Sequence, residues 1–79
     1  MSSTTRTATI AGHKVEMKAV EIFGGHWQIT TLVDGVVIRR EDEFVGNKQQ
    51  ASGIMQANIL RWKKMEQQGI DPFWDLLPR

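Results

Sequence analysis

The chain contains no cysteine, and this absence removes several classes of protein at once. Without thiols there is no disulfide scaffold, no cysteine-ligated zinc or iron–sulfur site and no thiol nucleophile. No apolar run approaches the roughly 18–20 residues that a membrane helix requires. The first residues also lack the apolar stretch of a signal peptide. We therefore expect a soluble, cytoplasmic protein that does not engage a membrane.

An excess of charge of either sign is also missing, since the formal net charge is +1. The chain is 41% hydrophobic and 24% charged, values typical of a globular protein rather than a disordered one. Its 79 residues predict a single domain over 1–79, with a thin core that makes partners important. Small chains of this size are often encoded by phages and mobile elements, and we keep that origin as a hypothesis.

Three turn signals divide the first half of the chain into segments rich in Val, Ile, Thr and aromatic residues. They are Ala11-Gly12-His13, Gly24-Gly25 and Asp34-Gly35. Gly-Gly and Asp-Gly suit two-residue hairpin turns because both central positions of a type I′ turn need positive φ. Such short turns allow only antiparallel neighbours. The pattern predicts a three- to four-stranded antiparallel meander within about 6–44, with strands near 6–10, 14–22, 26–33 and 36–44.

Counting outward from the turns predicts the register of the sheet. A two-residue turn at Asp34-Gly35 places Val33 opposite Val36 and Thr31 opposite Ile38. The same counting across Gly24-Gly25 places two residues of the second strand, Ile22 and Val20, opposite two of the third. Since side chains alternate between faces, one face becomes the predicted core face. It holds Val20, Ile22, Trp27, Ile29, Val33 and Ile38.

The second strand does not follow one alternation throughout. Val15 and Met17 occupy odd positions, whereas Val20 and Ile22 occupy even ones, so a strict period of two cannot bury both pairs. A β-bulge near Lys18-Ala19 would restore the phase. A break between two shorter strands is the alternative.

Residues 47–68 have the signature of one long helix. Asn47 followed by Gln50 forms a capping-box pattern, and Gly69 suits the left-handed position after the last turn. The apolar residues fall on one stripe at helical spacing. We predict that this stripe packs on the core face of the sheet, which makes the fold α+β. The stripe consists of Ala51, Ile54, Met55, Ile59, Trp62 and Met65.

The C-terminal tail, residues 70–79, is unusually apolar, since half of its ten residues are large apolar groups. Asp71 as N-cap and Pro72 as first residue favour one short helical turn. Two interpretations stay open. Either Phe73, Trp74 and Leu77 fold back over the small core, or the tail inserts into a second chain.

Catalytic signals are weak. His13 and His26 both fall at turns and are expected to be ordinary surface residues. The acidic run Glu41–Glu43 follows Arg39 and Arg40 on a strand, where neighbours point to opposite faces and do not converge. We interpret the run as a solvated edge that discourages aggregation. The sequence therefore predicts no enzyme, no metal site and no cofactor.

These observations favour a non-catalytic protein-binding module, an adaptor or inhibitor whose partner is another protein or its own copy as a homodimer. The predicted partner-binding residues come from the open sheet face, the helix and the tail: Leu32, Val37, Leu60, Phe73, Trp74, Leu76 and Leu77. The alternative is nucleic-acid binding, because the helix carries four cations against one carboxylate. That alternative would use Arg39, Arg40, Lys48, Arg61, Lys63 and Lys64.

Overall fold

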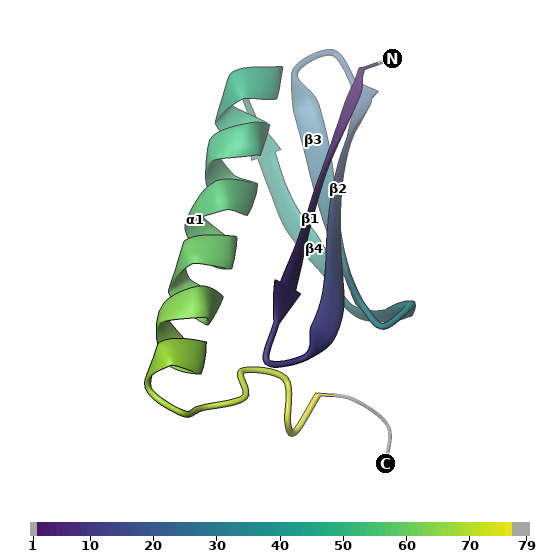
Figure 1. Ribbon diagram of the computed structural model, residues 1–79. Helices are drawn as coiled ribbons and strands as arrows, with labels where there is room; N and C mark the ends of the chain where they lie inside the picture. Colours follow the sequence, from purple (N-terminus) through teal and green to yellow (C-terminus); the bar gives the residue numbers. More distant parts are fainter. Residues whose placement is uncertain (1, 77–79) are drawn as a thin grey trace.

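The computed structural model describes residues 2–76, with residues 41–43 described through their backbone alone. The chain forms four strands, β1 (Ser3–Ile10), β2 (His13–Phe23), β3 (His26–Val33) and β4 (Val36–Val45), and one helix, α1 (Lys48–Gln67). The strands pair antiparallel in the order β1-β2-β3-β4, and α1 lies against one face of the sheet (Figure 1). The predicted α+β meander followed by one helix is therefore confirmed.

All three predicted turns are present, and their backbone explains the residues found there. Asp34 and Gly35 have φ of 51° and 82°, and Ala11 and Gly12 have φ of 52° and 79°. Positive φ at both central residues is the requirement of a type I′ turn, whose twist matches that of the flanking strands. β1 begins at Ser3, earlier than predicted, because its Thr-rich start pairs with the middle of β2.

The predicted phase of β2 is wrong. β1 and β2 pair without interruption across Lys18 and Ala19, and the register shift lies next to the turn, where Ile22 is skipped between Glu21 and Phe23. The odd residues of β2 therefore face the core up to Ala19, which pairs with Ile29 and is fully buried. Because the Ala19 side chain is small, it adds little to the apolar pattern, so the sequence does not show that the odd positions of β2 remain on the core face up to Ala19.

Two predicted core residues consequently lie on the opposite face of the sheet. Val20 and Ile22 are 46% and 41% exposed. Since a one-residue slip moves every side chain of a strand to the other face, the misplaced bulge accounts for both errors.

The pairing of β3 with β4 is predicted only in part. Val33 faces Val36 as expected, but Thr31 faces Arg39 rather than Ile38. Ile38 is an extra residue in β4 at a register shift, and a second shift lies between Trp27 and Ile29. Ile38 still packs against the core from the edge, so its predicted face is right although its partner is not.

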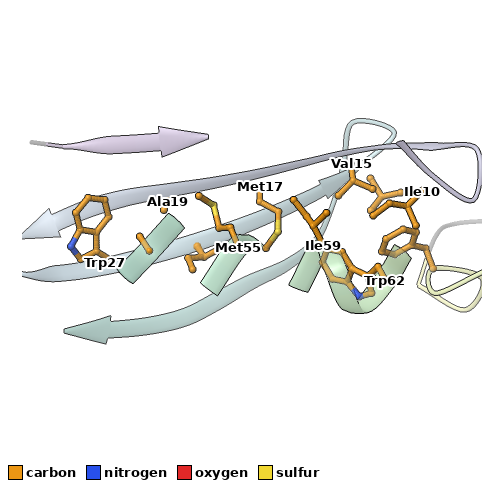
Figure 2. Packing of buried hydrophobic residues seen from close by; sticks show 12 residues of the cluster. Ile10, Val15, Met17, Ala19, Trp27, Met55, Ile59 and Trp62 are labelled. Carbon is orange, nitrogen blue, oxygen red and sulfur yellow. The ribbon is translucent and has the colours of Figure 1, made fainter. Parts of the chain in front are cut away.

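The core lies between α1 and the inner face of the first three strands. Figure 2 shows Met17 and Met55 side by side near the middle, Trp27 at one end, and Trp62 and Ile10 at the other end. Trp27 also donates its indole N–H to the Gly46 carbonyl oxygen at 3.1 Å, so its polar atom has a partner. The buried apolar residues are Ile10, Val15, Met17, Ala19, Trp27, Ile29, Val33, Ala51, Met55, Ile59, Trp62 and Phe73.

Both predicted helix caps are present. The Asn47 side chain accepts from the Gln50 N–H, and the Gln50 side chain accepts from the Asn47 N–H, each at 2.9 Å. At the other end, Gly69 has φ of 79° and the Ile70 N–H donates to the Met65 carbonyl at 3.0 Å, which is a Schellman ending. The C-terminal cap directs the chain from the end of α1 toward the β1–β2 turn (Figure 1).

Candidate functional site

His13 lies where three separate segments meet: the start of β2, the β3–β4 turn and the C-terminal tail. Its Nδ1 is 2.6 Å from Oδ2 of Asp34, and its Nε2 is 3.0 Å from Oδ2 of Asp71. The Phe73 ring packs against the imidazole nearly at right angles, with the ring centroids 5.9 Å apart. The imidazole is therefore half-buried and bridges two carboxylates, which corrects the expectation that His13 is an ordinary surface residue.

Each carboxylate is fixed by a second contact to the backbone. Oδ1 of Asp34 accepts from the Lys14 N–H at 2.9 Å, and the Asp34 N–H donates to the Lys14 carbonyl at 2.8 Å. Oδ1 of Asp71 accepts from the Phe73 N–H at 2.8 Å. The two aspartates are thus positioned by the turns they stabilise, and the imidazole joins the turns to each other.

The electrostatics of this cluster favour a protonated histidine. Hydrogen bonds to Asp34 and Asp71 raise the pKa of His13 above its ordinary value. The hydrogen bond from His13 lowers the pKa of Asp34, and the Phe73 N–H followed by His13 lowers that of Asp71. Each shift follows from stabilising the charged form of the group.

The arrangement restricts what His13 can do chemically. A general base or a metal ligand needs a ring nitrogen with an available lone pair, and both nitrogens of His13 face carboxylates. Among residues 2–76, no group of three or more His, Cys, Asp or Glu side chains is placed to hold a metal ion. The cluster connects the start of β2 to the β3–β4 turn and to the C-terminal tail.

Further polar contacts tie the first hairpin to the C-terminal third of the chain. The Arg6 guanidinium donates from Nη2 to the Ser52 hydroxyl at 2.6 Å and from Nη1 to Oε1 of Gln56 at 2.9 Å. The Ala11 N–H donates to the Glu66 carboxylate. Together with His13–Asp71, these contacts hold α1 and the tail over the β1 side of the sheet.

The tail divides between core and surface. Phe73 is completely buried, and its ring packs on that of Trp62 at a centroid distance of 5.2 Å. The next residue, Trp74, is 61% exposed, and Leu76 is 52% exposed. Two turns, closed by hydrogen bonds from Trp74 to Asp71 and from Leu76 to Phe73, replace the predicted helical turn.

The predicted partner-binding residues therefore have different environments. Phe73 belongs to the chain's own core, so its side chain offers no surface to a partner. On the open face of the sheet, Leu32 is half-buried, and its cross-strand partner Val37 is 42% exposed. Leu60, on α1, is 56% exposed. Leu77 lies outside the described residues, and so do the side chains of Glu41–Glu43.

The cations of the alternative function are all exposed, but the fold does not bring all six together. Arg39 and Arg40 pair with Thr31 and Thr30, so they start from opposite faces of the sheet. Lys48 and Lys63 are 15 residues apart on α1, a separation of about 22 Å along the axis. Arg61 donates to the Asn58 side chain at 2.9 Å.

The sequence does not reveal the His13 cluster, because Asp34 and Asp71 are 21 and 58 residues away from His13 along the chain. The available signals were the turn role of Asp34 and the capping role of Asp71. Both explain the residues locally and give no hint that the two carboxylates meet at one imidazole.

Comparison with known proteins gives no match to a family model, a curated protein or a solved structure. Within residues 2–76, α1 lacks the apolar character that crossing a membrane demands.

Proposed function

We propose that this chain is a non-catalytic protein-binding module that docks through its C-terminal tail. One observation carries the proposal: Phe73 and Asp71 fix the tail, while Trp74 and Leu76 lie mostly exposed beside them. An exposed apolar side chain on an anchored segment suits binding, because much of the conformational entropy of that segment is already lost before the partner binds. Tryptophan is also among the residues that most often dominate binding energy at interfaces.

The partner in this proposal is another protein or a second copy of the chain. The module would work in the cytoplasm as an adaptor or an inhibitor docked on a larger protein, and its size suits a phage or mobile-element protein. The non-catalytic part of the proposal is supported by His13, whose ring nitrogens both face carboxylates.

The open face of the sheet and α1 add exposed apolar surface that would extend such an interface. Single exposed apolar residues are common on any protein, so these residues carry less weight than the anchored tail. Apart from the tail, they are Val20, Ile22, Val37, Val45 and Leu60.

The test compares association of the wild-type chain with that of Trp74→Ala. We expect the wild type to form a dimer in light scattering behind a sizing column, or to retain a partner from host lysate. Trp74→Ala should weaken that association at least tenfold with little change in thermal stability, because the removed side chain lies mostly in solvent.

Phe23→Ala is the matched control, since Phe23 is 59% exposed and lies at the end of the sheet remote from the tail (Figure 1). It should leave tail-dependent association unchanged. If Trp74→Ala lowers the melting temperature and leaves association intact, the tail is only part of the chain's own core and the proposal fails.

A further inference from the structure

The tail is fastened to the sheet in two chemically different ways. Phe73 provides an apolar anchor in the core, and Asp71 provides a polar one through His13. Only the polar anchor contains a group that changes its charge near neutral pH, because histidine alone among unperturbed side chains titrates there.

We propose that His13 is a proton-operated clamp that holds the C-terminal tail when the imidazole is protonated and releases Asp71 when it is neutral. The inference deepens the proposed function, because the clamp would regulate how Trp74 and Leu76 are presented. The clamp itself is measurable without a partner.

Counting donors explains why the neutral ring cannot hold both aspartates. An imidazolium has two N–H donors, which match the carboxylates of Asp34 and Asp71, whereas neutral imidazole has one donor and one lone pair. After deprotonation, one carboxylate keeps the remaining N–H and the other faces the lone pair of a ring nitrogen. The second contact then becomes repulsive.

The structure indicates which carboxylate loses its contact. Asp34 is closer to the ring, at 2.6 Å against 3.0 Å, and two hydrogen bonds with the Lys14 backbone hold it in the β3–β4 turn. Asp71 belongs to the tail and has a single backbone contact, to the Phe73 N–H. We infer that Nδ1 keeps the proton toward Asp34 and that Asp71 separates from Nε2.

The charged groups around the ring support this direction. Asp34 from the turn and Asp71 from the tail both favour the imidazolium, and the raised pKa of His13 agrees with that. On α1, the Glu66 carboxylate accepts from the Ala11 N–H in the adjoining β1–β2 turn and adds negative charge on that side. On β2, the neighbouring cation is Lys14, which directly follows His13 and has an exposed side chain.

Release of Asp71 would leave Phe73 as the remaining anchor of the residues that follow. Trp74 and Leu76 would then lose the fixed presentation that favours binding, and association through the tail would weaken as pH rises through the His13 titration. The clamp would therefore make the proposed docking surface stronger in mildly acidic conditions than in alkaline ones.

The experiment follows the tail of the full chain by NMR between pH 5 and pH 9. Backbone ¹H–¹⁵N heteronuclear NOE values of Trp74 and Leu76 report tail order, and imidazole carbon-bound proton shifts report the His13 titration, assigned with His26→Gln. We expect the NOE values of both residues to fall together with the deprotonation of His13.

Asp71→Asn is the decisive variant. The new amide oxygen still accepts from the Phe73 N–H, and the new amide nitrogen can donate to a neutral Nε2, so the tail should stay ordered at high pH. The pKa of His13 should also fall below its wild-type value, because one carboxylate has been removed.

Asp75→Asn is the control, since it removes the same charge from an exposed position of the same tail. It should behave like the wild type. Tail order that does not change with pH in the wild type would overturn the clamp, and so would an Asp71→Asn variant that follows the wild-type curve. Association unchanged by Trp74→Ala would reject the proposed function alone and leave the clamp standing.

Discussion

Phe73 and Trp74 are adjacent, yet one is completely buried and the other lies mostly in solvent. The Asp71 carboxylate accepts the Phe73 N–H in the turn where the Phe73 ring packs on Trp62. This turn therefore separates an aromatic side chain in the core from one at the surface.

The pH dependence of stability follows from the same cluster. His13 has a raised pKa in the folded chain, so its contribution is complete below its unfolded value, about 6.5, and is lost as pH rises through the folded value. Asp34 and Asp71 have lowered pKa values, so their contributions are present above about 3.9 and are lost as pH falls through the folded values.

We therefore expect the largest contribution of this cluster to the free energy of unfolding between about pH 4 and pH 6.5. Urea unfolding at pH 5.5 and pH 8.5 should give the higher midpoint at pH 5.5. His13→Gln should reduce that difference. A midpoint that rises steadily into the alkaline range would contradict the sign of the His13 contribution.

At the scale of elements, two glycines, one within α1 and one at its end, differ in whether their backbone conformation requires glycine. Gly53 lies within α1, and a Cβ added there meets no atom within 4 Å. Gly69 has φ of 79° at the end of α1, a conformation that other residues adopt only with strain.

Alanine at these two positions should shift stability in opposite directions. Gly53→Ala should stabilise the chain by about 0.5–1 kcal/mol through helix propensity, and Gly69→Ala should destabilise it by about 1–2 kcal/mol. Thermal or urea unfolding of the two variants checks this pair. Destabilisation by Gly53→Ala would mean that this face of α1 packs against something, such as a second copy of the chain.

The elements themselves were predictable because their signals are local. Turn residues, the Asn47–Gln50 capping box and Gly69 each act within a few positions, and all of them appear where the sequence places them. The phase of β2 was not predictable, because Ala19 gives no apolar signal and the extra residue, Ile22, is itself apolar. The His13 cluster was missed because only tertiary structure brings Asp34 and Asp71 together.

For the molecule as a whole, the distribution of charge bears on the alternative function. Tight duplex binders make roughly 6–10 phosphate contacts, which requires cations gathered on one surface. Here the six candidate cations divide between two faces of β4 and the two ends of α1. The fold thus does not bring these six cations onto one surface.

We accordingly expect weak binding to DNA or RNA at about 50 mM salt, unaffected by charge reversal at Arg61 and Lys64. Fluorescence anisotropy with labelled duplex and single-stranded probes measures this directly. A tight affinity that falls steeply with salt and is lost in the Arg61→Glu and Lys64→Glu variants would instead establish nucleic-acid binding.

The placement of β1 has a mechanical consequence. Figure 1 shows that β1 starts at the end of the molecule opposite the tail and runs toward it, paired with β2 along its whole length. A pulling force applied between Ser3 and Leu76 would act along β1 and load its hydrogen bonds with β2 together, in shear. The sheet would then resist stretching along this axis more than peeling from the side.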